Sequence, residues 1–156
     1  MPINIRTPEE ALFIACEMEK RAVRMYERML MLFANPDNKS TLDQLLKDEQ
    51  GHLKHFQQML GENTLSGEEA LLLSAHGSGI LFAGGLTEAL RHGGVDTPEK
   101  MLTYAASQEE IAIHTYQGFA KRTQGEAAET FLAIAREEQQ HLRHLNTMLE
   151  KNEHHE

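Results

Sequence analysis

Hydrophobic residues recur at spacings of three and four along four stretches of the chain, the pattern that predicts amphipathic α-helices. We expect helices over about 7–34, 40–60, 97–123 and 126–151. The first and third begin with the same Thr-Pro-Glu sequence, in which threonine is the N-cap and proline takes the first helical position. The second should stop at Gly61, because glycine commonly ends a helix. The pattern therefore predicts an all-α protein whose single domain spans 1–156.

The segment between the second and third predicted helices, 61–96, has a different character. Glycines punctuate an apolar piece, Gly79-Ile80-Leu81-Phe82-Ala83-Gly84-Gly85. The segment is too long for a tight turn between helices, but it suits a crossover that returns the chain along a bundle. Its Ile80-Leu81-Phe82 run either covers the bundle or forms a contact in a homodimer, and both interpretations stay open.

The two predicted hairpins of helices repeat one another. A shift of 90 residues superimposes the first helix on the third, and a shift of 89 superimposes the second on the fourth. The matched pairs are Thr7 and Thr97, Pro8 and Pro98, Glu19 and Glu109, Tyr26 and Tyr116, Glu49 and Glu138, His52 and His141, and Leu60 and Leu149. A four-helix bundle with a pseudo-two-fold axis follows from this repeat.

Six ionisable side chains lie on the helical faces that the apolar residues place inward: Glu19, Glu49, His52, Glu109, Glu138 and His141. Bundle helices pack roughly 8–10 Å apart, so carboxylates from all four can meet near the midline. Buried carboxylates without partners are each costly by several kcal/mol, and no Lys or Arg recurs on these faces. Two divalent cations would instead bring four glutamates and two neutral histidines to a net charge of zero.

The composition excludes several other classes of protein. A formal net charge of −9 argues against nucleic-acid binding, which needs clustered Lys and Arg. No run approaches the ~18 apolar residues of a membrane-spanning helix, and the N-terminus lacks the pattern of a secretion signal. The single cysteine, Cys16, excludes an internal disulfide and a Cys-x-x-Cys metal site. We therefore expect a cytoplasmic protein that binds neither membrane nor nucleic acid.

The charged positions also resemble a known pattern, that of the ferritin-like di-iron carboxylate superfamily and its rubrerythrin-related branch without a rubredoxin domain. Beside the two Glu-x-x-His segments, the motif Ala-x-x-x-Glu-x-x-Ala-x-x-x-Tyr occurs twice, at Ala15-Glu19-Ala22-Tyr26 and at Ala105-Glu109-Ala112-Tyr116. The resemblance covers the four predicted helices and leaves the crossover and the tail outside it. It implies a non-haem centre of two iron ions, or of two manganese ions, in a bundle of two hairpins joined by a long crossover.

The resemblance also implies roles for individual residues. Three kinds of ligand are expected: two bridging carboxylates (Glu49 and Glu138), two terminal carboxylates (Glu19 and Glu109) and one imidazole for each metal (His52 and His141). Tyr26 and Tyr116 are expected to donate hydrogen bonds to carboxylates of the opposite helix, as candidate catalytic residues, or else to be ordinary core tyrosines. Asp48 and Glu137, four residues before the histidines, either accept an imidazole N–H and fix its tautomer or face solvent.

Two departures from the family pattern qualify the functional prediction. Rubrerythrins carry a further carboxylate ligand three residues after the third-helix glutamate, where this chain has Ala112. They also carry a rubredoxin domain with paired Cys-x-x-Cys motifs, whereas this chain has one cysteine. We therefore expect a more symmetric site, like that of bacterioferritin, and electrons that come from an external donor.

Three functional hypotheses follow. The first is an oxidoreductase of the rubrerythrin-like peroxidase or oxidase type, whose di-iron centre reduces hydrogen peroxide or dioxygen under oxidative stress. The second is a protein that binds iron, or a ferroxidase that handles it, without a dedicated substrate. The third is a di-manganese site of the catalase kind. Oxygen and imidazole ligands without thiolate favour redox-active iron over structural zinc.

Overall fold

The computed structural model describes residues 5–61 and 97–153, and these form four long helices. They are α1 (Pro8–Phe33), α2 (Lys39–Leu60), α5 (Pro98–Arg122) and α6 (Gly125–Glu153). No strand occurs in the described part, so the predicted all-α bundle is confirmed. The expected crossover, including Ile80-Leu81-Phe82, lies outside the described residues.

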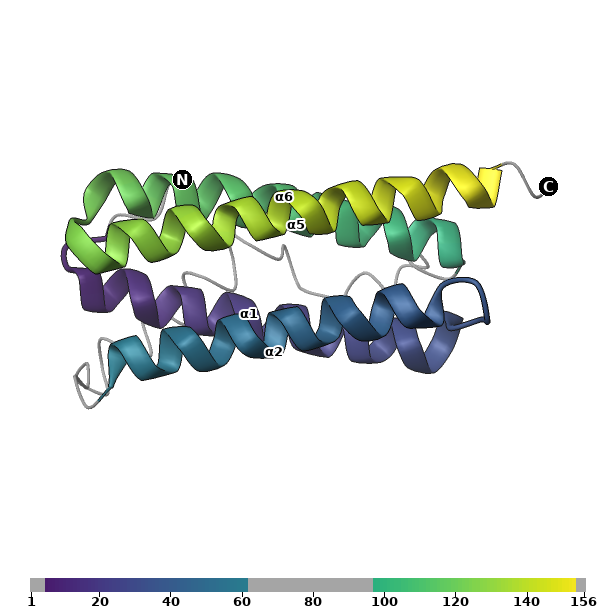
Figure 1. Ribbon diagram of the computed structural model, residues 1–156, viewed down its shortest axis with the longest axis horizontal. Helices are drawn as coiled ribbons and strands as arrows, with labels where there is room; N and C mark the ends of the chain where they lie inside the picture. Colours follow the sequence, from purple (N-terminus) through teal and green to yellow (C-terminus); the bar gives the residue numbers. More distant parts are fainter. Residues whose placement is uncertain (1–4, 62–96, 154–156) are drawn as a thin grey trace.

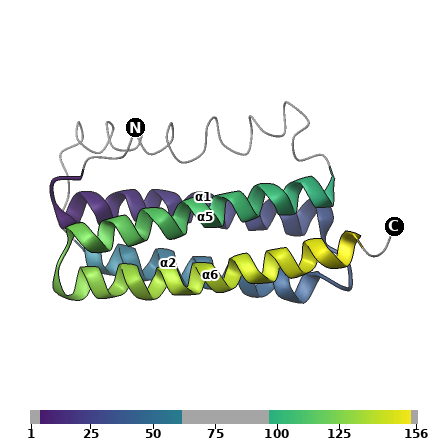
Figure 2. The same ribbon diagram turned by 90° about the horizontal axis from the view of Figure 1, so that it is seen from above.

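The helices are arranged as two hairpins laid against each other (Figure 1). Within the hairpins, α1 packs against α2 and α5 packs against α6. Between them, α1 lies beside α5 and α2 lies beside α6, as the view from above shows (Figure 2). Neighbouring helices run antiparallel and extend along the same length of the bundle, so the middle of each helix lies beside the middle of its neighbours. None of the four is apolar enough over a sufficient length to cross a membrane.

The helix ends follow from the residues that occupy them. The hydroxyl groups of Thr7 and Thr97 each accept a hydrogen bond from the backbone N–H three residues later, at 3.1 Å, and so cap α1 and α5. Gly61, which ends α2, and Gly125, which begins α6, have φ values of 56° and 62°. This left-handed backbone region is open to glycine without steric penalty. The first helix of each hairpin thus begins with the same threonine cap, as the repeat predicts.

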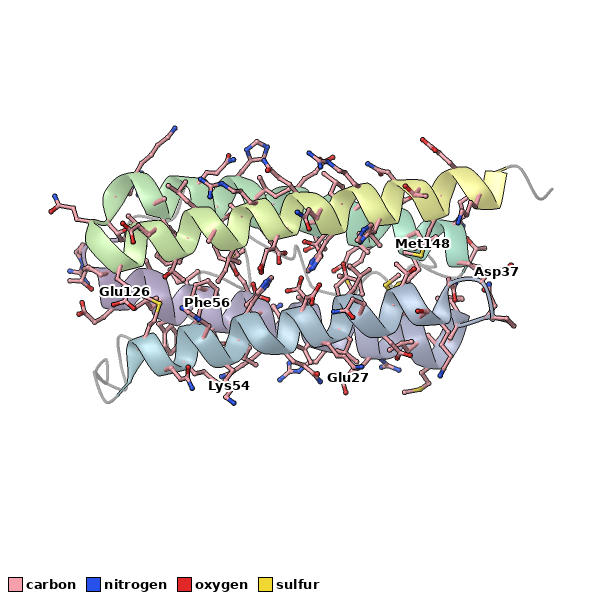
Figure 3. The ribbon with its side chains drawn as sticks, in the orientation of Figure 1. Glu27, Asp37, Lys54, Phe56, Glu126 and Met148 are labelled. Carbon is pink, nitrogen blue, oxygen red and sulfur yellow. The ribbon has the colours of Figure 1, made fainter. Side chains whose placement is uncertain are left out.

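Buried apolar side chains form two separate clusters along the bundle. Phe56 belongs to the first and points into the bundle, whereas Lys54, two residues earlier on α2, points away from it (Figure 3). Neighbouring rings in this cluster have centroids 5.4 to 6.5 Å apart; they are Phe56, Tyr116, Phe119 and Phe131. The second cluster is rich in methionine and leucine, including Met25, Met29, Leu42, Leu45, Met101, Leu102, Leu145 and Met148.

The apolar spacing predicts that the inner stripe of the first helix consists of Leu12, Ala15, Cys16, Glu19, Ala22, Val23, Tyr26, Met29 and Leu30. The buried face of α1 is broader than this stripe. Ile14, Met18 and Met25 are buried although they fall outside that stripe, whereas Ala22 and Val23, which fall on it, are only half-buried. Because α1 packs against both α2 and α5, it buries two adjoining stripes where a helix with one neighbour buries one. A single apolar stripe therefore underestimates the core of this bundle.

Candidate metal centre

The six predicted ligand residues come together between the two apolar clusters. They are Glu19 from α1, Glu49 and His52 from α2, Glu109 from α5, and Glu138 and His141 from α6, and none is more than 5% exposed. Residues three apart on a helix share one face, so each Glu-x-x-His helix directs both of its polar groups inward. The sequence thus places a charged layer in the middle of an otherwise apolar interior.

Donor atoms from these residues form two overlapping sets. One set joins Glu19, Glu49, His52 and Glu138, and the other joins Glu49, Glu109, Glu138 and His141. Within each set, one atom from every residue lies within 4.8 Å of the others. Glu49 and Glu138 belong to both sets. This is the arrangement expected for two cation positions that share two carboxylates.

Both histidines direct Nδ1 toward the carboxylates. His52 Nδ1 lies 2.9 Å from Glu138 Oε1 and 3.7 Å from Glu19 Oε1. His141 Nδ1 lies 2.7 Å from Glu49 Oε1 and 3.6 Å from Glu109 Oε1. The two rings are stacked, with centroids 5.8 Å apart and planes inclined by 20°. Each histidine therefore contributes its Nδ1 to one of the two donor sets.

Although each Nδ1 lies close to a carboxylate oxygen, many of these buried donor atoms make no hydrogen bond of acceptable geometry with a described residue. They are Nδ1 of both histidines and five carboxylate oxygens: Glu19 Oε2, Glu49 Oε1 and Oε2, Glu109 Oε2 and Glu138 Oε1. Buried polar groups are otherwise almost always paired. Oxygen and imidazole donors with unused lone pairs, directed at a common point, fit divalent cations such as Fe²⁺ or Mn²⁺.

The other nitrogen of each histidine contacts an acid on the neighbouring helix. His52 Nε2 contacts Glu137 Oε2, and His141 Nε2 lies 3.1 Å from Asp48 Oδ2. Asp48 and Glu137 therefore contact imidazole nitrogens, as the first of the two interpretations expected, but each contacts the histidine of the neighbouring helix and not the one four residues later on its own helix. Because α2 and α6 are antiparallel neighbours, as Figures 1 and 2 show, Asp48 of α2 can reach His141 of α6. A proton held on Nε2 by such an acid leaves the Nδ1 lone pair available to a metal.

The two buried tyrosines cross-link α1 and α5 through the terminal glutamates. Tyr26 donates its hydroxyl hydrogen to Glu109 Oε1, and Tyr116 donates to Glu19 Oε1 at 2.8 Å. Burial, and then the charge of the partner glutamate, raise the pKa of both hydroxyls well above the usual value. The phenols therefore stay protonated and hold one oxygen of each carboxylate, while the catalytic role of these tyrosines stays a prediction.

Comparison with known families bears on the same residues. Residues 100–156 match the Rubrerythrin family model. The match contains Glu109, Tyr116, Glu138 and His141, and it confirms the resemblance to the ferritin-like di-iron superfamily. The first hairpin, outside the match, carries the same motifs through the internal repeat. No curated protein and no solved structure matches the chain.

Without bound cations, the buried charges of the cluster would be compensated by protons. Burial and the nearby charge of Glu49 raise the pKa of both Glu19 and Glu138 well above the usual range. Burial alone would lower the pKa of the two imidazoles, but the surrounding carboxylates raise it to about 11 for His52 and about 10 for His141. The cluster therefore holds protons near neutral pH that a bound metal must displace.

Metal binding should consequently strengthen as the pH rises. A ligand must lose its proton before it binds, so a pKa raised in the metal-free protein makes each bound ion release protons. If one proton leaves per ion, affinity for Mn²⁺ should increase by about tenfold per pH unit between pH 6 and 8. Calorimetric titration in two buffers with different ionisation enthalpies measures both quantities. Affinity that is independent of pH would contradict this account of the cluster.

A small cavity of about 20 Å³ lies beside the charged layer. This is room for roughly one water-sized molecule. Ala22 of α1 and Ala112 of α5, which the repeat relates, both line this cavity. Ala112 is the position where rubrerythrins have a further carboxylate, so that position borders the cavity in this protein. The wall is completed by Met18, Glu19, Glu49, Gln108, Glu109, Ile111, Tyr116 and Glu138.

Besides Ile111, the cavity wall includes two residues that the motifs did not single out, Met18 and Gln108. They occupy equivalent positions under the 90-residue shift but differ in chemistry. This break in the repeat is the feature of the sequence that could have drawn attention to them. Cys16 is buried, and burial raises the pKa of its thiol to about 11. His55 and His144, three residues beyond the ligand histidines, are exposed.

Proposed function

We propose that the protein binds two iron ions and uses them to reduce hydrogen peroxide or dioxygen, with electrons from an external donor. The observation that carries this proposal is the set of buried, unpaired donor atoms, grouped so that Glu49 and Glu138 serve both positions. Glu19 and His52 would complete one position, and Glu109 and His141 the other. The Rubrerythrin match over the second hairpin supports iron as the metal.

Two bound iron ions would supply the two electrons that cleave an O–O bond and would polarise that bond. The protein supplies the surroundings for this reaction. Tyr26 and Tyr116 hold the terminal glutamates in place, and Asp48 and Glu137 hold the imidazoles in one tautomer. The apolar clusters on either side exclude bulk water, and the adjoining cavity has room only for a very small oxidant.

Rapid mixing of the ferrous protein with each oxidant tests the proposal. Anaerobic protein loaded with two Fe²⁺ per chain should be oxidised in one phase, with one peroxide and two protons consumed per pair and two waters formed. The near-ultraviolet absorption of the ferric product follows the reaction. Absence of oxidation faster than that of free Fe²⁺ would contradict the proposed reduction of oxidants.

The same experiment separates the alternative functions. A ferroxidase that handles iron should release its ferric product and oxidise further Fe²⁺ added in excess, whereas a peroxidase should stop after one pair until a reductant is added. The donor set also suits manganese. A manganese-loaded protein that disproportionates peroxide without any reductant, while the iron-loaded protein is inert, would favour the catalase-like site.

A further inference from the structure

One polar group beside the charged layer is not used by the proposed ligands or by their hydrogen bonds. Gln108 precedes Glu109 on α5, and its Oε1 is buried without a partner among the described residues. Its Nε2 instead donates to the hydroxyl of Ser107, which is exposed, at 3.4 Å. The amide therefore presents its oxygen, an acceptor, to the interior. Gln108 is also one of the residues that line the small cavity.

The cavity wall does not carry a second glutamine at the position that the repeat relates to Gln108. The residue equivalent to Gln108 in the first hairpin is Met18, which lines the same cavity. The proposed ligands, the two tyrosines and the flanking alanines are the same residue types in both hairpins, whereas Met18 and Gln108 differ. The cavity wall is therefore less symmetric than the site that it adjoins. The wall thus contains a hydrogen-bond acceptor at Gln108 and a thioether at Met18. A ligand in the cavity would therefore meet one strong polar contact that the metals do not provide.

We propose that Gln108 selects an oxidant that carries O–H groups, so that hydrogen peroxide is preferred over dioxygen. Hydrogen peroxide has two hydrogens to donate, whereas dioxygen has none. Under the proposed function, on which this inference rests, the carboxylates of the cavity bind metal and the Tyr116 hydroxyl is committed to Glu19. Among the described residues that line the cavity, Gln108 then provides the side-chain oxygen, buried and unpartnered, that remains for the substrate. A site that hydrogen-bonds its substrate discriminates strongly against an analogue that lacks the donor.

The substitution Gln108→Met, which copies the residue of the first hairpin, removes this acceptor with little change of volume. The variant should keep two metals per chain and react with peroxide about tenfold more slowly, the loss expected for one hydrogen bond. Its rate with dioxygen should stay within about twofold of the parent rate. Gln140→Met is the matched control, because Gln140 also precedes a proposed ligand but is exposed. Stopped-flow mixing of the ferrous parent and of both variants with each oxidant measures these rates.

A crystal structure of the zinc-loaded protein supplies a readout that needs no turnover. Zinc is redox-inert, and an ordered solvent oxygen should lie within hydrogen-bond distance of Gln108 Oε1 in the cavity. A dry cavity, or equal slowing of Gln108→Met with both oxidants, overturns the inference. A Gln108→Met protein that reacts with peroxide as fast as the parent also overturns the inference. In each of these cases the proposed function still stands if the parent reacts with peroxide. A parent that binds two metals but reacts with neither oxidant overturns both.

Discussion

Replacing Glu138 with leucine is expected to leave the protein unable to hold a metal pair. Glu138 contributes to both donor sets, so its loss removes an oxygen ligand from each proposed position. Leucine has a similar volume and no donor atom. The metal content after dialysis should fall from two ions per chain to one or none, and elemental analysis measures it. A Glu138→Leu protein that retains two ions would contradict the ligand assignment.

The same substitution should not unfold the metal-free protein. Burial and like charges already disfavour the ionised form of Glu138, whose pKa is raised, and apolar residues of similar size often replace buried charges at no cost in stability. Without metal, thermal unfolding of the variant should therefore occur at or above the parent temperature. With metal added, only the parent should be stabilised. Glu129→Gln, an exposed change on the same helix, should behave as the parent in both experiments.

Replacing Phe131 with alanine is expected to destabilise the bundle by about 3–5 kcal/mol, the range for truncating a buried aromatic side chain. Phe131 is fully buried, and its ring centroid lies 5.5 Å from Phe56, 5.9 Å from Tyr116 and 5.4 Å from Phe119. It thus joins three of the four helices at one end of the core. Urea unfolding at a fixed metal content measures the change.

The adjacent residue supplies the control for this prediction. Leu132 is 42% exposed, so Leu132→Ala removes a side chain of the same helix that contributes little to the core. Its effect should stay below about 1 kcal/mol, as for most surface substitutions. If Phe131→Ala were as mild as Leu132→Ala, the aromatic cluster could not be a main source of the stability of this end.

The fold could be predicted because local and long-range signals agree. The Thr-Pro-Glu caps, the apolar spacing and the internal repeat all specify two equivalent hairpins. The six inward charges were also predictable, since Glu19 and Glu109 share the buried stripe with tyrosine and alanine, and each Glu-x-x-His occupies one helical face. What these positions have in common is that their direction depends only on the helix that carries them.

Features that depend on how the helices lie against each other were not accessible from the sequence. The pairing of His141 with Asp48 requires that α2 and α6 be antiparallel neighbours in a particular register. Burial of Ile14 and Met25 requires the second neighbour of α1. Gln108 lies beside a ligand without belonging to any motif, and only the cavity and its unpaired oxygen distinguish it. Helical periodicity contains no information about these relations.

The proposed function depends on the claim that four buried glutamates and two histidines hold two cations in the middle of the bundle. Anomalous diffraction at the iron absorption edge, from crystals grown with Fe²⁺ under anaerobic conditions, tests it most directly. Two peaks should lie within the four helices, one beside Nδ1 of His52 and one beside Nδ1 of His141, with Glu49 and Glu138 between them. An interior without peaks, or iron found only at exposed histidines such as His55 and His144, would contradict the claim.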